Sequence, residues 1–159
     1  MLPAMPASLR AEHEGLRADL QRAMGMEGRI GKAARALASL LDLHFGKEDD
    51  KVLLALGLLQ VVAQGQVAPA MREVVVMTDR LKVELPEMLA EHDQIRDALK
   101  RLAQTAVEEG RPKVAEFSEK LLQHARLEEE VLYPAAIILG EYLKYRLTTE
   151  GTAPQGGQA

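Results

Sequence analysis

The sequence predicts an all-α protein, an antiparallel up-down-up-down four-helix bundle, and three observations predict it. Four long segments are rich in Ala, Leu, Glu, Lys and Arg, which are strong helix formers. Within each segment the apolar residues recur at alternating steps of three and four, the spacing of one helix face. The period-two alternation of strands is nowhere sustained. Because short breaks separate the segments, we expect neighbouring helices to run antiparallel.

The first two segments each carry one apolar stripe that includes a histidine. Ser8 is the predicted N-cap of the first helix, and the break at Gly25–Gly28 separates it from the second. The stripe of the first helix comprises Leu9, His13, Leu16, Leu20 and Ala23. The stripe of the second comprises Leu37, Leu41, His44, Glu48, Val52, Leu56 and Leu59. Both patterns predict amphipathic helices with a histidine facing the core.

The last two segments repeat this design after a break at Gly65–Pro69. Pro86 and Pro134 fall inside helical patterns, so each predicts a kink or a helix end, and Ala70–Glu84 could form a separate lead-in helix before the third helix. Gly110, followed by Pro112, predicts the turn to the fourth helix. The third stripe comprises Leu85, Met88, His92, Ile95, Leu99, Leu102 and Ala106. The fourth comprises Val114, Phe117, Leu121, His124, Glu128, Val131, Ala135 and Ile138.

The chain has the length of one domain. We expect residues 1–147 to form it and the Gly-, Gln- and Thr-rich residues 148–159 to be a disordered tail. The run Val52–Leu59 is apolar on all sides of a helix and therefore needs burial on more than one side. It could pack under Ala70–Glu84 or form a dimer interface, so we expect a monomer or a homodimer.

Composition excludes several classes of function. The net charge of −4 offers no basic surface for nucleic acid or anionic lipid. No segment has the length and apolarity of a membrane span or the layout of a signal peptide, so we expect a cytoplasmic protein. Cysteine is absent, which excludes disulfides, thiol catalysis, iron–sulfur clusters and zinc fingers.

All four histidines fall on predicted core stripes, one in each helix. Two of them are followed four residues later by a glutamate on the same face, as His44 by Glu48 and His124 by Glu128. An unpaired buried carboxylate costs several kcal/mol, and no Lys or Arg shares these stripes. Imidazole and carboxylate together form a ligand set suited to iron, so a metal site accounts for the buried glutamates.

The arrangement occurs twice along the chain. The segment His13–Leu20 resembles His92–Leu99, and His44–Leu53 resembles His124–Tyr133. Each half offers two histidines and one glutamate, which predicts a pseudo-twofold bundle enclosing two metals. Structural zinc prefers thiolates, and calcium and magnesium prefer oxygen ligands. Two irons or manganese ions bridged by carboxylates fit better, although the order of ligands differs from that of ferritin-like proteins.

The series His13, His44-x-x-x-Glu48, His92, His124-x-x-x-Glu128, with Glu128-Glu129-x-x-Leu132-Tyr133-Pro134 after it, resembles the hemerythrin-like, or HHE cation-binding, family. The resemblance implies a hemerythrin-like bundle with two non-haem irons. His13 and His44 would bind one iron and His92 and His124 the other. Glu48 and Glu128, with an oxo or hydroxo group, would bridge them.

The chain differs from the oxygen-carrying members of that family, which have a fifth histidine. Met88 and Arg96 stand four residues before and after His92, where the carriers have the extra ligand. The resemblance therefore implies a protein that binds or senses oxygen, nitric oxide or a related small molecule such as peroxide. The alternative is an enzyme that reduces nitric oxide or peroxide, or an iron donor in repair of iron–sulfur centres. Whether the protein is an enzyme is left open, with binding preferred.

Other residues near these motifs are weaker candidates. Tyr133 lies nine residues after His124, on the opposite face of a regular helix, so it would reach the metals only if Pro134 distorts the helix. Arg17 and Arg96 recur one turn after a histidine, and we expect them to be solvated or ion-paired at the bundle edge rather than to line the site. The acidic residues that follow Glu48 and Glu128 are predicted to be solvated.

Overall fold

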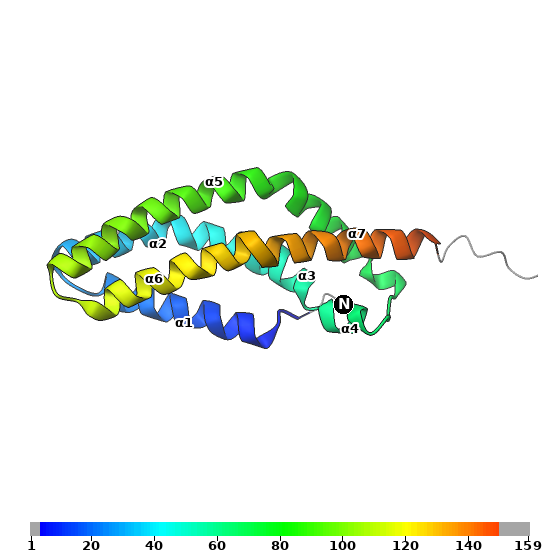
Figure 1. Cartoon of the computed structure of the whole chain (residues 1–159), viewed down its shortest axis with the longest axis horizontal. Helices are drawn as coiled ribbons and strands as arrows, with labels where there is room; N and C mark the ends of the chain where they lie inside the picture. The colour runs from blue at the N-terminus through cyan, green and yellow to red at the C-terminus, as the bar shows by residue number, and fades with distance from the viewer. Residues whose placement is uncertain (1–3, 150–159) are drawn as a thin grey trace, which may run out of the picture.

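The computed structural model describes residues 4–149, and every regular element within them is helical. Four long helical segments lie side by side (Figure 1). In chain order the elements are α1 (Ala7–Met24), α2 (Gly28–Glu48), η1 (Asp49–Leu53), α3 (Leu54–Leu56), α4 (Leu59–Ala63), η2 (Pro69–Met71), α5 (Arg72–Glu108), α6 (Pro112–Leu127), η3 (Glu128–Leu132) and α7 (Tyr133–Thr149). The predicted all-α class and helical bundle are confirmed, while the antiparallel order stays a prediction.

The second and fourth segments are longer than one α-helix each. The second runs from α2 through η1 into α3, and the fourth runs from α6 through η3 into α7. Both η1 and η3 are π-helical turns, in which one extra residue is accommodated without ending the helix. The bundle contacts connect α1 with α2 and α6, and α5 with α2 and α6.

The separate lead-in helix before the third helix is not seen. Residues Arg72–Glu108 form one continuous helix, α5, which contains Pro86 in its interior and curves along the bundle in Figure 1. A proline inside a helix removes one backbone hydrogen bond and bends the helix without necessarily ending it. The bend lets the N-terminal part of α5 pack against α7 while the C-terminal part packs against α6.

The turn between α5 and α6 follows its prediction. Gly110 has a φ of 63°, in the left-handed region that glycine adopts without a steric penalty. Pro112 then opens α6, where its fixed φ suits the first turn and its missing N–H has no intrahelical partner to lose. At the other end of the bundle the prediction for Ser8 was wrong. Helix α1 begins at Ala7 after Pro6, and no side chain caps it.

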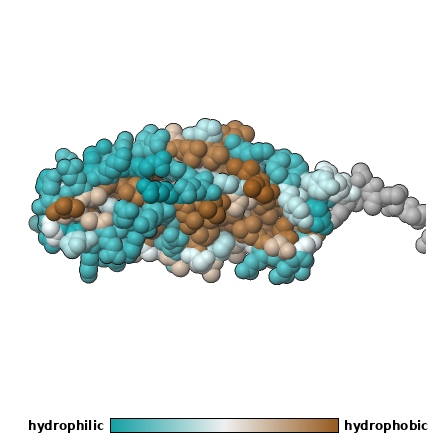
Figure 2. Space-filling model, viewed as in Figure 1, coloured by the Kyte–Doolittle hydropathy of each residue, from teal (hydrophilic) through white to brown (hydrophobic). Residues whose placement is uncertain are grey.

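Two hydrophobic clusters fill the bundle. One cluster includes Leu20, Leu37, Leu99 and Leu121 and occupies the half containing the α1–α2 and α5–α6 turns. The other lies in the half formed by α3, the first part of α5 and α7. Apolar side chains also reach the surface of that second half (Figure 2). Between the two clusters lies a band of buried polar side chains.

In the fourth predicted stripe, the residues before the polar band are buried as predicted, whereas beyond the band other residues face the core. Val131 and Ile138 were predicted to face the core, but they are 50% and 67% exposed. Tyr133, Ala136 and Leu139 are buried in their place. The π-helical turn η3 explains the difference, because one extra residue rotates all that follows by about 100° relative to a regular helix.

The apolar run after Glu48 packs inside the molecule. Val52, Leu53 and Leu56 are buried in the same cluster as Val74 and Leu81 of α5, which confirms packing against the segment Ala70–Glu84. The π-helical turn η1 contributes to this packing, because two adjacent residues within it, Val52 and Leu53, are both buried.

Two residues of the predicted tail are helical. Thr148 and Thr149 belong to α7, and the remainder of the 148–159 segment lies outside the described residues. The domain limits themselves stay a prediction. Among the helices of residues 4–149, none has both the length and the apolarity required to cross a membrane.

Candidate metal centre

The polar band contains all six residues that the sequence singled out. His13 comes from α1, His44 and Glu48 from α2, His92 from α5, His124 from α6 and Glu128 from the start of η3. Each is at most 2% exposed. The helices position them between the two apolar clusters, which exclude water from both sides. The sequence prediction that these six side chains meet in the core is therefore confirmed, and their use as metal ligands stays a proposal.

The histidines are paired across the two halves of the sequence. His13 Nε2 lies 2.8 Å from His124 Nε2, and His44 Nε2 lies 2.7 Å from His92 Nε2. These are contacts between imidazoles, and the expectation that His13 and His44 share one iron and His92 and His124 the other stays a prediction.

The two glutamates lie between these histidine pairs. Glu128 Oε1 is 2.6 Å from His124 Nε2, and Glu128 Oε2 is 3.3 Å from His92 Nε2, so this carboxylate spans both pairs. Glu48 Oε1 is 3.0 Å from His44 Nε2, and its Oε2 is 4.0 Å from His13 Nε2. Each carboxylate therefore offers one oxygen to each pair, the arrangement of a bridging ligand.

Each imidazole has its second ring nitrogen directed at a carboxylate outside the centre. His92 Nδ1 donates to Glu129 Oε1 at 2.7 Å, and His13 Nδ1 donates to Asp49 Oδ1 at 3.2 Å. His44 Nδ1 donates to Glu91 Oε2 at 2.7 Å. Such contacts fix the tautomer in which Nε2 is free to bind a metal, and they are usual around metal-bound histidines.

Basic side chains hold three of these outer carboxylates in place. Arg17 Nη2 donates to Asp49 Oδ2 at 2.6 Å, and Arg96 Nη1 donates to Glu129 Oε1 at 2.8 Å. Lys47 donates to Glu91. The prediction that Arg17 and Arg96 are ion-paired is confirmed. The prediction that the acidic residues after Glu48 and Glu128 are solvated was wrong for Asp49 and Glu129, because each turns inward to a histidine.

The fourth outer carboxylate is held less firmly. Glu12 Oε1 lies 3.0 Å from His124 Nδ1, but the two groups lack the angles of a hydrogen bond, and this buried nitrogen has no hydrogen-bond partner. The side chain of Glu12 is 41% exposed. The side of the centre at His124 is therefore less tightly closed than the other three.

Tyr133 reaches the centre, contrary to the face predicted for it. Its hydroxyl donates to Glu48 Oε1 and lies 3.3 Å from His44 Nε2 and 3.2 Å from His92 Nε2. The side chain is 1% exposed. The cause is the π-helical turn η3, which ends immediately before Tyr133 and adds a residue between Glu128 and the next inward position. The distortion lies just before Pro134, the residue whose effect on the helix the sequence left open.

Burial and charge shift the pKa values of these groups strongly. Burial alone would lower the pKa of His44 and His124, but contacts with Glu48 and Glu128 respectively outweigh it and raise each to about 9. Burial and the nearby charge of Glu128 raise the pKa of Glu48. Burial likewise acts to raise the pKa of Glu128, yet the surrounding imidazoles hold it well below its usual range. Protons thus supply positive charge to the buried carboxylates in the metal-free protein.

Burial and the two nearby glutamates raise the pKa of Tyr133 far above its ordinary value in the metal-free protein. The phenol therefore keeps its proton at neutral pH and acts as a hydrogen-bond donor to Glu48. Because the phenol is neutral, Tyr133 adds no negative charge to Glu48 and Glu128.

The arrangement fits two metal ions. One group of ligand atoms comes from His44, Glu48, His92 and Glu128, and the other from His13, His124 and Glu128. Within each group the atoms lie within 4.8 Å of one another. Glu48 Oε2 is buried and has no hydrogen-bond partner, which is costly for a carboxylate oxygen. The nitrogen and oxygen donor set, with bridging carboxylates and no sulfur, suits iron.

The residues near the centre that sequence reasoning missed are the outer carboxylates Glu12, Asp49, Glu91 and Glu129, whereas Tyr133 was considered and assigned to the opposite face. A signal for the carboxylates was present, because an acid precedes both His13 and His92 and another follows both Glu48 and Glu128. No comparable signal marks Tyr133, since the corresponding residue of the other half is Leu53.

Comparison with known proteins agrees with this geometry. The family model described as the hemerythrin HHE cation-binding domain matches residues 4–136, which is most of the chain. No curated protein and no solved structure matched. The matched region contains all six converging residues and Tyr133.

Proposed function

The chain belongs to the hemerythrin HHE cation-binding domain family, and we propose that it is a non-haem di-iron protein that binds or senses a small molecule such as oxygen or nitric oxide. The observation that carries the proposal is the convergence of four Nε2 atoms and two carboxylates in a buried band, with three of the four Nδ1 atoms hydrogen-bonded to carboxylates outside it. Imidazoles so oriented are prepared to bind metal through Nε2.

The geometry suggests which residues hold each ion. We assign one iron to His44 and His92 and the other to His13 and His124, with Glu48 and Glu128 bridging them and an oxo or hydroxo group completing the bridge. The assignment follows the Nε2 distances of 2.7 and 2.8 Å and the position of each glutamate between the pairs. The metals would supply redox chemistry and an open coordination position for a small molecule.

The chain's own residues provide the environment for that binding. Asp49, Glu91 and Glu129 orient the imidazoles, and Arg17, Arg96 and Lys47 hold these carboxylates in turn. The apolar clusters on both sides exclude water. Four histidines and two glutamates leave fewer protein ligands than a closed pair of metals would need, which favours a site where an external molecule binds. We expect the protein to act in the cytoplasm as a monomer or homodimer.

The function is tested by adding oxygen or nitric oxide to the iron-loaded, anaerobically reduced protein and recording the visible spectrum. We expect a saturable change with about one molecule bound per pair of irons. The control is the double variant His13→Ala/His92→Ala, which removes one histidine from each pair and should show no such change. A wild-type spectrum that equals that of the variant would contradict the proposal. Sustained consumption of nitric oxide or peroxide above the rate of free iron would identify the protein as an enzyme instead.

A further inference from the structure

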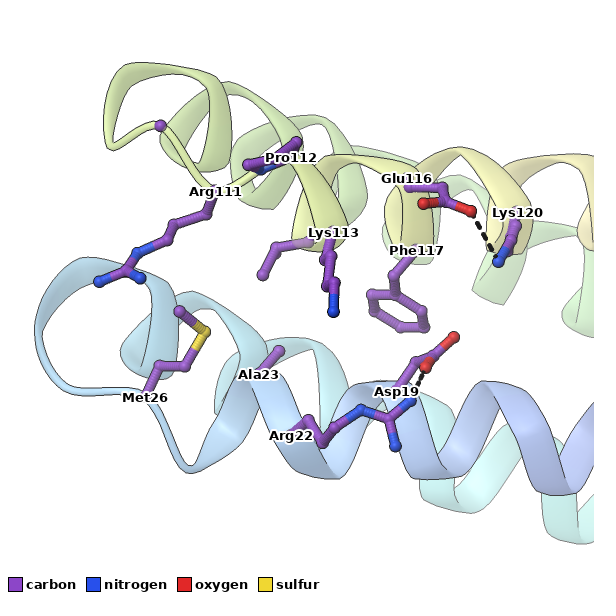
Figure 3. A pocket seen from close by; sticks show the side chains of 12 residues that line it. Asp19, Arg22, Ala23, Met26, Arg111, Pro112, Lys113, Glu116, Phe117 and Lys120 are labelled. Atoms are coloured by element: carbon purple, nitrogen blue, oxygen red, sulfur yellow. Dashed lines mark hydrogen bonds and ion pairs between the residues drawn. The ribbon is translucent and has the colours of Figure 1, made fainter.

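A hollow lies on the surface at the end of the bundle, between the end of α1 and the start of α6 (Figure 3). Its volume is about 600 Å³, which falls within the range of small-molecule sites in proteins. None of the six candidate metal ligands lines it. The hollow is therefore separate from the candidate metal centre.

The floor of the hollow is formed by side chains of the apolar core. Val114 and Phe117 of α6 and Ala23 of α1 line it, and each is at most 7% exposed. All three belong to the hydrophobic cluster of this half of the bundle, and Met26, in the turn to α2, packs against the same cluster. An apolar molecule placed here would cover core side chains, which is favourable.

The hollow lies where a small residue of α1 faces a large residue of α6. When the two halves of the sequence are aligned on their histidines, Ala23 corresponds to Leu102 of α5, and Phe117 corresponds to Leu37 of α2. Leu37 and Leu102 are fully buried in the same cluster. Helix α1 thus has a methyl group at the level where α5 contributes a whole leucine side chain, and this leaves space beside Phe117.

Four of the charged side chains around the hollow form two ion pairs. Asp19 pairs with Arg22 within α1, and Glu116 pairs with Lys120 within α6, the latter at 2.9 Å. Each acidic side chain of the lining therefore already has a basic partner one turn away on its own helix.

The two remaining basic side chains of the lining have no such partner. Arg111 and Lys113 extend from the start of α6 toward α1 (Figure 3). Within residues 4–149 neither side chain makes a hydrogen bond or an ion pair. In the other half of the sequence the corresponding residues are Gly31 and Ala33, which carry no charge. These two unpaired cations therefore have no counterpart at the start of α2.

Two unpaired cations above an apolar floor fit a ligand that is negatively charged at one end and apolar at the other. Guanidinium and ammonium groups both form charge-assisted hydrogen bonds with a carboxylate. The chain as a whole has a net charge of −4, so the positive charge here is a local feature. An inorganic anion would leave the apolar floor uncovered, and an uncharged apolar molecule would leave both cations unpaired.

We propose that the hollow binds a small organic monocarboxylate with an apolar body. Arg111 and Lys113 hold the carboxylate, and the body of the ligand lies against Phe117, Met26 and Ala23. This site is additional to the di-iron centre, and its occupation does not depend on the metals.

The first part of the test separates the contributions of the two ends of the ligand. Sodium octanoate is titrated into the purified full chain in a calorimeter, and we expect saturable binding at a single site. Sodium acetate has the carboxylate without the body, and 1-octanol has the body without the carboxylate. Each should bind at least about tenfold more weakly than octanoate. Equal affinity for 1-octanol would overturn the role of the cations, and equal affinity for acetate would overturn that of the floor.

The second part removes the two cations. Arg111→Ala/Lys113→Ala should lower the affinity for octanoate by about tenfold or more. The matched control, Lys32→Ala/Arg101→Ala, removes the same two charges from exposed side chains that do not line the hollow, and it should keep the wild-type affinity. Equal affinities in the Arg111→Ala/Lys113→Ala protein and the wild type would overturn the proposal.

The third part locates the bound octanoate. The methyl group of Met26 is followed by NMR in protein labelled with ¹³C at its methionine methyl groups, and its signal is assigned with Met26→Leu. We expect octanoate to shift this signal and to leave the visible spectrum of the iron-loaded protein unchanged. A changed visible spectrum with an unshifted Met26 signal would place octanoate at the metals and overturn the proposal. A wild-type protein that binds no octanoate would also overturn it, while the di-iron function would stand.

Discussion

At the scale of single residues, the feature that most distinguishes the centre is the carboxylate beside each outward-facing imidazole nitrogen. Asp49 directly follows Glu48 and Glu129 directly follows Glu128, and each accepts a hydrogen bond from a histidine of another helix. The neighbouring Asp50 and Glu130 are exposed and have no such contact. Two adjacent acids of the same charge thus have different roles, because only one of them faces the bundle.

This difference gives the first prediction. Asp49→Asn and Glu129→Gln should each weaken iron binding by about 10- to 100-fold, because an amide holds the imidazole less firmly and lowers its basicity. The measurement is the competition of the protein with a chelator of known affinity. Asp50→Asn and Glu130→Gln are the matched controls and should bind iron as the wild type does. Equal losses in both sets would show that only the overall charge of the surface matters.

The Tyr133 hydroxyl gives the second prediction. Tyr133→Phe leaves Glu48 without its phenolic donor in a buried position, which should lower the free energy of unfolding of the metal-free protein by about 1–3 kcal/mol. Urea denaturation measures the change. Tyr145→Phe is the control, since Tyr145 is 65% exposed and its loss of a hydroxyl should change stability by less than about 0.5 kcal/mol. A Tyr133→Phe protein as stable as the control would contradict the buried contact.

The six candidate ligands could be predicted from the sequence, while the contact of Tyr133 with Glu48 and the close approach of His13 to His124 could not. A histidine or glutamate on an otherwise apolar helix face stands out in the sequence. The face of a single helix is therefore enough to identify each candidate ligand. The contact between His13 and His124 depends on how α1 and α6 pack against each other. The spacing of residues along one helix carries no information about that packing. The position of Tyr133 depends on the π-helical turn η3, and Pro134 indicates an irregularity there without indicating its kind.

At the scale of elements, the π-helical turns η1 and η3 decide how each half of the bundle continues beyond the centre. Turn η1 begins at Asp49, directly after Glu48, and turn η3 begins at Glu128 itself. The stripe predicted with regular spacing is correct for Leu121 and His124 and fails at Val131. Periodicity therefore predicts a helix reliably and predicts its buried face only while the helix stays regular.

The close contact between α5 and α7 gives the third prediction. A Cβ atom at Gly140 would lie 2.6 Å from Cβ of Thr78, whose hydroxyl already donates to Val74 O at 3.1 Å. Gly140→Ala should therefore lower the free energy of unfolding by about 1–3 kcal/mol through overpacking, measured by urea denaturation. Gly46→Ala, with open surroundings in α2, should instead raise it by about 0.5–1 kcal/mol. A Gly140→Ala protein that gains stability like Gly46→Ala would contradict this helix contact.

At the scale of the whole molecule, a buried charged band divides the hydrophobic interior into two clusters. In the metal-free protein protonated His44 and His124 offset the charge of Glu48 and Glu128, and the Tyr133 hydroxyl donates a hydrogen bond to Glu48. Metals bound there would join four helices from both halves of the sequence. The sequence could predict the bundle and its polar middle, because composition and spacing report on each helix separately. It could not predict the continuous α5 or the unequal sides of the centre, which depend on contacts between helices.

Metal removal gives the fourth prediction. Binding of iron to the folded state but not to the unfolded chain should raise the melting temperature, and its removal should lower the Tm by about 10 °C or more. Differential scanning calorimetry before and after verified chelation measures the change. Restoring the iron should restore the original Tm. An unchanged Tm would contradict the assignment of Glu48 and Glu128 as bridging ligands.

The central claim is that the six residues hold two metal ions, one at each histidine pair. The measurement that tests it most directly is the number of irons per chain in two double variants that each lose two histidines. The wild type should hold two irons. His44→Ala/His92→Ala, which removes one pair, should keep one iron, whereas His44→Ala/His124→Ala, which removes one member of each pair, should keep none. Equal iron contents in the two double variants, or a wild type without iron after loading, would contradict the account.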